Sequence, residues 1–478
     1  MQDCTRHFIN GEWRSSTGGS GSTVINPATG KPCGYVALGS IEDAQDAVTA
    51  ARVAFADWSA TPREERILRM QALLAEYDSR SEAIAEALTD EIGCPLSLSR
   101  SAQVPIGRAH IATAIEVLHD FRFEDDRTPT RIVREPVGVC GLITPWNWPL
   151  NQIACKVAPA LAAGCTVVLK PSELSPASAR IFAEAVAAAG FPKGVFNLVQ
   201  GDGTAVGAEL SRHPDVDMVS FTGSNRAGVR VAINAAPTVK RVHQELGGKS
   251  ACIVLDDDAL ADNVASAVLH VMLNSGQSCN APTRILAPAS RRDEAVAAAR
   301  KACESLTLGN PRDDVRMGPV VSDAQWKRVQ AYIELAIAQG ATLVCGGLGK
   351  PPGLESGAYV RPTVFADVTP DSTLAREEVF GPVAALMTYE SHDEAVRIAN
   401  ETIFGLAGYV RGADVAVTRS LATRIRAGQV SINGAGGDFR APFGGYRQSG
   451  NGREWGEAAF HEFLEVKALL GFSTAEAP

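Results

Sequence analysis

The 478-residue sequence has no excess of positive charge, with 45 lysines and arginines against 54 aspartates and glutamates. It also contains no basic block and no basic patch interleaved with aromatic residues. Because phosphate binding depends on clustered Lys and Arg, a chain with a formal net charge of −9 is not expected to bind nucleic acid.

Long hydrophobic runs are missing as well. Residues 1–7 lack the apolar core of a secretion signal. The longest apolar stretch, residues 157–169, contains Pro159 and Gly164 and is too short to span a bilayer. With 45% hydrophobic and 21% charged residues, the composition is that of a globular protein. We therefore expect a soluble, cytoplasmic protein without a membrane partner.

Closely spaced cysteine pairs are also absent. None of the ten cysteines forms a C-x-x-C motif, so the sequence predicts neither a zinc site nor a disulfide framework, and no metal is expected. Nine cysteines are interpreted as small hydrophobic residues. Cys279 is the exception, because small and polar residues surround it in the segment 276–284, at a turn that ends an apolar pattern.

A second reactive group lies upstream of this cysteine. Glu245 stands beside Gly247 and Gly248, where the backbone can approach a ligand closely. A thiol nucleophile and a carboxylate that activates water are the groups needed to form and then hydrolyse a thioester. If the two segments meet in space, the chain is an enzyme.

The length exceeds one ordinary core and predicts at least two domains. Two helical stretches, 41–58 and 64–89, precede a rhythm of short apolar runs and helices. The first block has expected strands at 137–144, 166–170, 195–199 and 218–222, with helices at 151–163, 175–189 and 203–212. The second has expected strands at 251–255, 283–287, 383–389, 408–411 and 429–432, with helices at 262–274, 291–305, 322–339 and 392–400. This βαβ rhythm predicts an α/β protein of two doubly wound parallel-sheet domains.

Several turns could carry ligand-binding chemistry. The segment 221–228 ends an expected strand and opens a helix, so its glycine turn either faces a pyrophosphate or is an ordinary strand–helix connection. Lys170 and Glu173 either bind vicinal hydroxyls, as in a ribose, or form a solvated turn with a capping glutamate. Glu378 and Phe380 lead into a Gly-Pro turn that is either a ligand-facing loop or exposed charge.

The segment 144–149 packs two Trp and two Pro around Asn147. Such a rigid wall can aim the Asn147 amide N–H at a developing oxyanion, although a buried structural turn remains the alternative. Lys156 follows inside an apolar helix. It either extends its ammonium group to water at a helix end or is a buried charge near a ligand.

Taken together, these segments resemble the NAD(P)-dependent aldehyde dehydrogenase superfamily, from about Phe8 to the C-terminal strand. Seven motifs occur in the order of the family. They are TPWNWPL at 144–150, KPSE at 170–173, FTGS at 221–224, ELGGKS at 245–250, GQSC at 276–279, EEVFGPV at 377–383 and PFGG at 442–445.

The resemblance implies Cys279 as the nucleophile, Glu245 as the general base and Asn147 as an oxyanion donor beside the Cys279 backbone N–H. It connects Lys156 and Glu454 with proton relay to the base. The implied cofactor-binding residues are Thr144, Pro145, Trp146, Lys170, Ser172, Glu173, Gly203, Phe221, Gly223, Ser224, Leu246, Gly247, Glu378 and Phe380. The expected substrate pocket comprises Trp148, Gln152, Ser278, Asn280 and Phe443.

The resemblance also divides the chain. It implies a dinucleotide-binding domain at 1–117 and 137–246 and a catalytic domain at 247–448. Oligomerisation strands and a tail are expected at 118–136 and 449–478. Segments 130–135 and 463–469 alternate like edge strands and would suit pairing across the subunits of a homodimer or homotetramer.

The implied reaction is NAD-dependent oxidation of an aldehyde to a carboxylic acid through a Cys279 thiohemiacetal and thioester, with hydrolysis assisted by Glu245. Glu173 at the ribose would repel a 2′-phosphate and favours NAD, whereas Lys170 keeps NADP possible. The alternatives are a CoA-acylating semialdehyde dehydrogenase, against which Glu245 argues, and a non-catalytic binding protein. Aliphatic and aromatic aldehydes are both possible substrates. Arg440 either recognises a carboxylated aldehyde or faces solvent.

Overall fold

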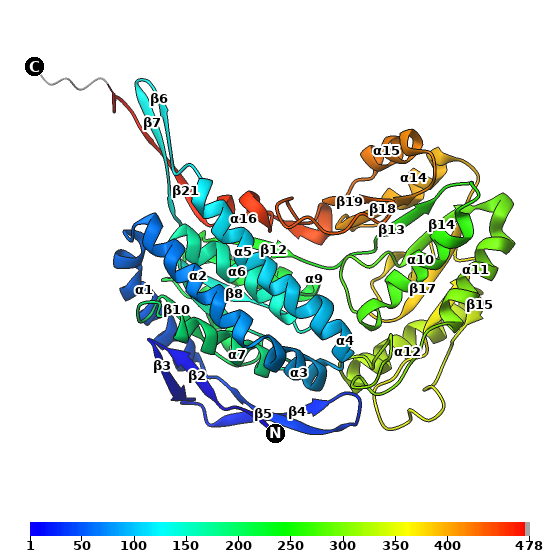
Figure 1. The fold of residues 1–478 in the computed structure, drawn as a ribbon, viewed down its shortest axis with the longest axis horizontal. Helices are drawn as coiled ribbons and strands as arrows, with labels where there is room; N and C mark the ends of the chain where they lie inside the picture. The colour runs from blue at the N-terminus through cyan, green and yellow to red at the C-terminus, as the bar shows by residue number, and fades with distance from the viewer. Residues whose placement is uncertain (474–478) are drawn as a thin grey trace, which may run out of the picture.

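The computed structural model describes residues 1–473, which form two α/β lobes and a narrow three-stranded arm that projects from the first lobe (Figure 1). Each lobe is built around one predominantly parallel sheet with helices on both faces. The predicted fold class, two doubly wound α/β units with a small β appendage, is therefore confirmed.

The first lobe contains an eight-stranded sheet in the order β20-β12-β11-β8-β9-β10-β2-β3. Its parallel strands are β8 (Val139–Ile143), β9 (Thr166–Lys170), β10 (Phe196–Leu198), β11 (Met218–Thr222) and β12 (Arg241–Glu245). The antiparallel edge strands are β2 (Arg6–Ile9), β3 (Glu12–Ser15) and β20 (Gly450–Asn451). Because helices cover both faces, β8, β9, β10 and β11 are buried along their whole length.

Alternate residues of these strands pack on opposite helix layers. One face meets α2 (Arg63–Ser79), α3 (Ser81–Ile92), α5 (Val104–Asp120), α6 (Pro149–Ala163) and α7 (Pro176–Ala188). The other meets α1 (Ile41–Ser59), α8 (Val206–Arg212) and α9 (Asn225–Ala235). From β8 the chain moves outward to β9 and β10, then returns to β11 and β12 on the other side. That reversal is the kind of point at which open α/β sheets bind ligands.

The second lobe has seven strands in the order β15-β16-β17-β14-β13-β18-β19, all parallel except β15. They are β13 (Ala251–Val254), β14 (Arg284–Pro288), β15 (Thr342–Cys345), β16 (Thr363–Ala366), β17 (Val383–Tyr389), β18 (Ala407–Arg411) and β19 (Gln429–Ile432). Helices α10 (Leu260–Met272) and α11 (Arg292–Glu304) cover one face. Helices α12 (Asp323–Ala338), α14 (His392–Asn400) and α15 (Val415–Arg424) cover the other.

The arm consists of β6 (Glu124–Arg127), β7 (Thr130–Pro136) and β21 (Leu464–Leu469) in the order β21-β7-β6. The segment expected as an oligomerisation tail, 449–478, is more divided than predicted. Its β20 joins the sheet of the first lobe, α16 (Gly456–Glu462) packs on α5 and α6, and only β21 enters the arm. Residues 474–478 of that segment lie outside the described residues.

Two further expectations need correction. Residues 1–40 form strands, including a sheet of β1 (Gln2–Cys4), β5 (Lys31–Leu38) and β4 (Ser20–Asn26), which the sequence reading left unassigned. The helix expected at 64–89 is two helices, because the backbone leaves helical geometry at Arg80.

The cysteines differ from expectation at one pair. Cys303, in the last turn of α11, forms a disulfide with Cys345 at the end of β15. The two lie 42 residues apart in sequence, so a search for short motifs could not detect them. Of the eight free cysteines, six are buried, whereas Cys33 and Cys279 are half-buried.

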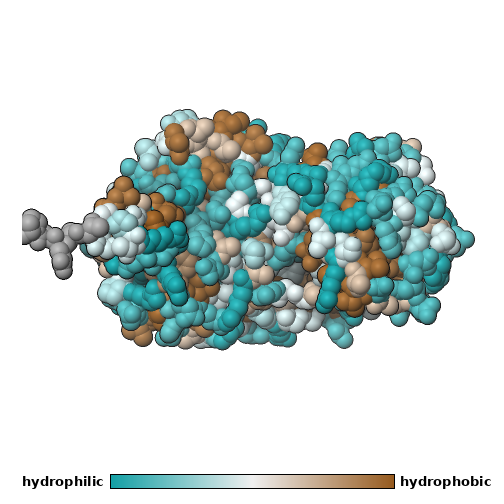
Figure 2. Space-filling view, turned by 90° about the horizontal axis from the view of Figure 1, so that it is seen from above, coloured by the Kyte–Doolittle hydropathy of each residue, from teal (hydrophilic) through white to brown (hydrophobic). Residues whose placement is uncertain are grey.

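One face of the molecule can be judged by its hydropathy. Figure 2 shows a mostly hydrophilic face with hydrophobic residues in separate patches. No helix among residues 1–473 is long and apolar enough to cross a membrane. Over the same residues, no group of three or more His, Cys, Asp or Glu side chains could hold a metal ion.

Candidate active site

A cavity of about 260 Å³ joins segments from both lobes. The β8–α6 connection, the end of β11 and the link 246–247 form one part of its wall, and the Cys279 loop, α12 and the loop 377–382 form the rest. The cavity brings together ten residues singled out in the sequence: Pro145, Trp146, Asn147, Gly223, Ser224, Leu246, Gly247, Cys279, Glu378 and Phe380. Thr222 of the FTGS motif also lines it, as do Gln325 and Arg328, which no motif marks.

The loop that presents Cys279 has an unusual backbone. Asn274 and Ser275 both adopt left-handed φ angles, of 52° and 56°. Gly276 follows with φ 73°, and a Cβ there would lie 2.1 Å from the backbone of Gly381. Only glycine fits this close approach, which fixes the start of the loop against the segment that carries Glu378.

The link between the lobes touches the same loop. A Cβ on Gly248 would lie 2.3 Å from the backbone oxygen of Cys279. The Gly248 N–H donates to Glu378 Oε1 at 3.0 Å, and a Cβ on Gly247 would lie 2.5 Å from the other oxygen of that carboxyl. Because Gly247 and Gly248 have no side chains, the Glu378 carboxyl and the Cys279 loop can both lie close to the backbone of this linking segment.

Asn147 is tied to the cysteine loop by hydrogen bonds. Its amide nitrogen donates to the backbone oxygen of Gln277 at 3.0 Å, and its own backbone oxygen accepts from Gln103 and Asn274 at 3.1 and 2.9 Å. The second N–H of the amide has no protein partner in the part of the chain that the structure describes. Since Asn147 and Cys279 line one cavity, that N–H is available to a ligand there.

The Cys279 thiol is half-buried beside negative charge. Burial, followed by the charges of Glu378 and Glu245, raises the pKa of the thiol. In the free protein the thiol is therefore largely protonated at neutral pH, because desolvation and nearby carboxylates both disfavour the thiolate.

Glu245 ends β12 and is buried, with 3% of its surface exposed. Neither carboxyl oxygen has a hydrogen-bond partner within residues 1–473. Burial, with the charge of Glu454 as the next contribution, raises the pKa of Glu245 well above its ordinary value. His243 lies 3.7 Å away but does not offset this, since burial and Lys156 lower the pKa of His243 to about 3. A raised pKa in an unpartnered buried carboxyl is typical of functional sites.

Lys156 and Glu454 form a buried ion pair beside this carboxyl. Lys156 also donates to Ser220 Oγ at 3.0 Å, and the Cys155 thiol donates to Glu454 at 3.3 Å. Burial opposes the charge on Glu454, but Lys156 holds the pKa of Glu454 below its ordinary value. Glu454 and Glu245 interact through charge and share no hydrogen bond in the described residues.

Phe380 and Glu378 are held from α12, which the sequence reading did not connect with the site. Gln325 donates to the Phe380 backbone oxygen at 2.7 Å, and Arg328 donates to that of Glu378 at 2.7 Å. Phe380 has φ 62°, and its ring meets the edge of Trp146 at 5.4 Å between centroids. No motif marks α12, because a polar helix residue some fifty positions away carries no local signal.

The other predicted cofactor residues lie outside this cavity. Lys170, at the end of β9, donates to the Gly201 backbone oxygen at 2.7 Å and lies 3.6 Å from the Glu173 carboxyl. Thr144 N–H donates to the Lys170 oxygen at 3.1 Å, which joins the ends of β8 and β9. The remaining three lie near these ends: Ser172 accepts from Leu174 N–H, Gly203 precedes α8, and Phe221 packs under Gly223.

The predicted substrate residues do not line this cavity. Trp148 Nε1 donates to Ser278 Oγ at 2.8 Å. The backbone oxygen of Asn280 accepts from Tyr409 at 2.8 Å. The other two are Gln152, which is buried, and Phe443, whose ring stacks on Trp455 at 4.6 Å.

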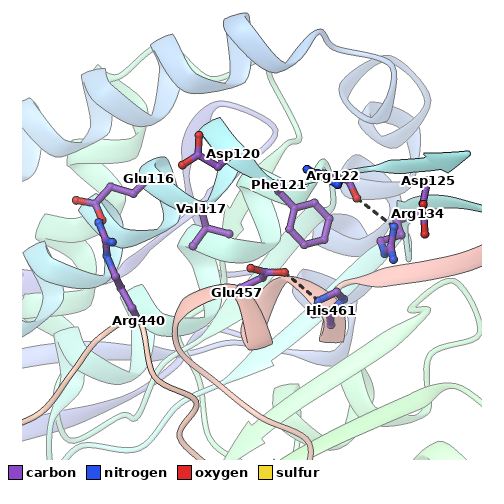
Figure 3. A pocket seen from close by; sticks show the side chains of 10 residues that line it. All are labelled: Glu116, Val117, Asp120, Phe121, Arg122, Asp125, Arg134, Arg440, Glu457 and His461. Carbon is purple, nitrogen blue, oxygen red and sulfur yellow. Dashed lines mark hydrogen bonds and ion pairs between the residues drawn. The ribbon is translucent and has the colours of Figure 1, made fainter.

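A separate pocket of about 500 Å³ opens between α5, α16 and the arm (Figure 3). Arg440 points across it to Glu116 and forms an ion pair at 2.6 Å. In the same view, His461 Nε2 and the Glu457 carboxyl of α16 lie 3.6 Å apart. None of the predicted catalytic or cofactor residues lines this pocket. The exposed, paired side chain of Arg440 agrees with the solvent-facing alternative.

Comparison with known proteins gives a consistent result. The sequence model of the Aldehyde dehydrogenase family matches residues 13–469. A 3-succinoylsemialdehyde-pyridine dehydrogenase from a Pseudomonas species is 51% identical over 474 residues, 99% of each chain.

Two solved structures illustrate the likeness of fold. An Aldehyde Dehydrogenase C variant from Pseudomonas syringae, complexed with NAD+ and octanal, shares 49% identity with a TM-score of 0.98, covering 99% of this chain and 98% of that one. An aldehyde dehydrogenase from Mycobacterium tuberculosis complexed with NAD+ shares 39% identity with a TM-score of 0.95, covering 98% of both chains. The chain belongs to the aldehyde dehydrogenase family.

Proposed function

We propose that Cys279 is the nucleophile and Glu245 the water-activating base of this NAD-dependent aldehyde dehydrogenase. One observation carries the proposal: a single cavity holds Cys279 together with Asn147, Glu378 and Phe380, and the unpartnered Glu245 carboxyl is buried nearby. In the sequence these residues belong to separate motifs that lie far apart, and the fold brings them together at one cavity.

In the proposed mechanism, the Cys279 thiolate adds to the aldehyde carbon. The free N–H of Asn147 and the Cys279 backbone N–H donate to the resulting oxyanion, each worth about 3–4 kcal/mol in comparable sites. NAD, when bound in the cavity, supplies the acceptor for the hydride of the aldehyde carbon. Cys279 then carries the acyl group as a thioester. Glu245 takes a proton from water, whose oxygen attacks that thioester and releases the carboxylic acid.

The residues present suit a dinucleotide. Ser224 stands at the N-terminus of α9, where backbone N–H groups favour a phosphate, and Glu378 and Phe380 offer a carboxyl and a ring in the cavity. Glu173, 40% exposed, is placed to accept from ribose hydroxyls and would repel a 2′-phosphate. Lys170 beside it keeps NADP as the alternative, which a comparison of kcat/KM for the two cofactors tests.

The direct test is an NAD-reduction assay without CoA across aliphatic, aromatic and ω-carboxylated aldehydes. We expect NADH and a carboxylic acid from wild type, and no turnover but retained NAD binding from Cys279→Ser. Product that forms only when CoA is added would support the CoA-acylating alternative. Full turnover by Cys279→Ser would contradict the assignment, and absence of NADH with every aldehyde would favour a non-catalytic protein.

We further propose that the chain works as a cytoplasmic homodimer or homotetramer. Residues 1–117 and 137–246 would bind the dinucleotide, residues 247–448 would carry catalysis, and 118–136 with the C-terminal strand would mediate assembly. Support for assembly comes from exposed apolar side chains on α9, where Val229 and Ile233 are 57% and 64% exposed, and from the edge strand β21, where Val466 is 66% exposed. Composition supports the cytoplasmic location.

A further inference from the structure

Two neighbouring strands of the first lobe place polar side chains on one buried face beside Glu245. The parallel pairing of β11 with β12 sets Ser220 directly opposite His243. Because alternate residues of a strand point to the same face, His243 and Glu245 share a face of β12. Ser220 has 0% of its surface exposed and His243 has 2%. Neither residue takes part in the mechanism proposed above, although both lie beside its base.

A chain of hydrogen bonds fixes the tautomer of His243. Burial opposes the charge on Lys156, but Glu454 raises the pKa of Lys156, so its ammonium group is charged at neutral pH and donates to Ser220 Oγ at 3.0 Å. This oxygen lies 3.1 Å from His243 Nδ1. The Ser220 hydroxyl has no other acceptor within residues 1–473, and a buried hydroxyl that donates to nothing is unfavourable. Ser220 therefore donates to Nδ1, and the ring hydrogen is on Nε2.

The Nε2–H of His243 lies next to the base. Burial and then the charge of Lys156 lower the pKa of His243 to about 3, so the ring is neutral at neutral pH and offers one N–H. Nε2 lies 3.7 Å from Glu245 Oε1, and neither atom has a hydrogen-bond partner in the described part of the chain. The contact is longer than a hydrogen bond, but the hydrogen bonds of catalytic groups are often long in a free enzyme and shorten in its complexes.

Close packing holds the ring and the carboxyl near each other. A Cβ on Gly452 would lie 2.2 Å from His243 Cδ2, so only glycine lets the ring lie against this loop. A Cβ on Gly444 would lie 2.8 Å from Glu245 Oε1. Backbone at these two glycines therefore confines both partners of the contact.

The other ionisable groups near Glu245 do not replace this N–H. Burial and the charge of Glu454 raise the pKa of Glu245, whereas Lys156, Arg453 and the Gly445 backbone lower it. None of these side chains donates a hydrogen bond to Glu245 in the described residues. Two thiols nearby are uncharged at neutral pH because burial raises the pKa of each, those of Cys155 and Cys279.

We propose that Ser220 and His243 are positioning residues for the base: Ser220 holds the imidazole in the tautomer whose Nε2–H donates to the Glu245 carboxylate. A hydrogen bond to the charged form of a carboxyl favours that form, so the donor increases the fraction of Glu245 that can take a proton from water. Because Nε2 already carries its hydrogen, His243 does not itself take up that proton. This inference rests on the proposed function, since Glu245 must be the base.

The test measures thioester hydrolysis against pH in His243→Leu and His243→Gln. Leucine removes the N–H at a comparable size, whereas glutamine keeps an amide N–H. Acid quench and mass spectrometry follow the loss of the acyl group from the Cys279 peptide after one turnover with NAD and the fastest aldehyde of the panel. In His243→Leu, the pH of half-maximal hydrolysis should rise by about one unit or more, the value of a hydrogen bond to a charged group. His243→Gln should restore most of the wild-type profile.

Two further variants isolate the chain of hydrogen bonds. Ser220→Ala leaves Nδ1 without its donor and should shift the profile in the same direction. Gln244 lies on the opposite face of β12 and donates to the Gly228 backbone oxygen, so Gln244→Met is the matched control and should keep the wild-type profile. The burst of NADH at 340 nm should keep its rate in every variant, which shows that each is folded and that Cys279 still reacts.

An unshifted profile in His243→Leu would overturn the inference, as would equal shifts in His243→Leu and His243→Gln, since the N–H would then not matter. Loss of the NADH burst in His243→Leu would also overturn it, because the residue would then serve the fold or the first half of the reaction. The proposed function fails differently. If Glu245→Gln hydrolysed the thioester as fast as wild type, then Glu245 would not be the base, whatever the result at His243.

Discussion

Cys279 and Glu245 are both in environments that disfavour their charged forms. Burial is the main cause for each, and neighbouring carboxyls add to it. Their pKa values are therefore raised in the free protein, which disfavours the Cys279 thiolate and the Glu245 carboxylate. Burying these two groups away from water is unfavourable for folding. We interpret this unfavourable burial as part of the function, because both side chains must contact a ligand rather than water.

The raised pKa of Cys279 predicts a pH dependence. A raised pKa means less thiolate at a given pH, so alkylation of Cys279 by iodoacetamide should accelerate as pH rises through the alkaline range. Glu378→Gln removes a negative charge that raises this pKa and should shift the profile to lower pH. Glu377→Gln, at an exposed neighbouring carboxyl, is the control and should leave the profile in place. If the pH profiles of alkylation were identical for Glu378→Gln and Glu377→Gln, then the charge of Glu378 would not raise the pKa of the Cys279 thiol.

A second expectation concerns hydrolysis. Glu245→Gln keeps the shape of the side chain but removes the base, so deacylation should slow by at least about 100-fold. Stopped-flow measurement at 340 nm should then show a burst of NADH near one equivalent per site, followed by slow turnover. If Glu245→Gln turned over as fast as wild type in the steady state, then a group other than Glu245 would activate the water.

Single residues were predictable where a motif carries them. Cys279, Glu245, Asn147 and Glu378 stand in short, recognisable segments, and the family to which those segments pointed is confirmed. Gln325 and Arg328 lie on the amphipathic helix α12. The spacing of its hydrophobic residues indicates which face packs on the protein core, but it does not indicate that polar residues of the helix contact the site. Their contact with the site follows from how α12 packs, which one sequence does not reveal.

At the scale of elements, close backbone approach constrains the geometry of the site. Gly248→Ala would place a Cβ 2.3 Å from the Cys279 backbone oxygen, so the cysteine loop must shift. A displacement of about 1 Å can cost about 100-fold in rate, and we expect kcat/KM to fall by at least about that factor. Gly436→Ala, with no atom within 4 Å of its Cβ, should retain activity and Tm. Equal activity of the two variants would contradict the contact.

The apolar strands were the most predictable elements. The strands β9 and β17 have the bounds that their apolar runs predicted, because strands covered on both faces are mostly apolar along their length. The N-terminal strands escaped detection, since β3 and β4 are largely exposed and lack that signature. The Cys303–Cys345 pair escaped for a different reason: it depends on α11 packing against β15.

At the scale of the whole molecule, the exposed apolar face of α9 predicts assembly. Ile233→Glu places a charge on a side chain that is 64% exposed and should lower the mass measured by light scattering. Val53→Glu, at a 75% exposed position on α1, is the matched control and should not change that mass. An unaltered mass in Ile233→Glu would exclude this face from the interface.

The two-lobe architecture followed from the βαβ rhythm, but the meeting of the lobes did not. Cys279 comes from the second lobe and Asn147 from the first, and 130 residues separate Asn147 from the Gln277 oxygen that it contacts. Only the folded arrangement brings the thiol, the amide and the Glu378 carboxyl to one cavity. The proposed reaction thus depends on how the two lobes pack against each other.

The most direct test of the account is mass spectrometry of Glu245→Gln after brief mixing with NAD and an aldehyde, followed by acid quench and digestion. We predict that the peptide containing Cys279 gains the mass of the acyl group, and that hydroxylamine removes it, because a thioester is cleaved by that nucleophile. Cys279→Ser with the same substitution at Glu245 should show no adduct. An unmodified Cys279 peptide while NADH accumulates would contradict the central claim that this cysteine carries the reaction.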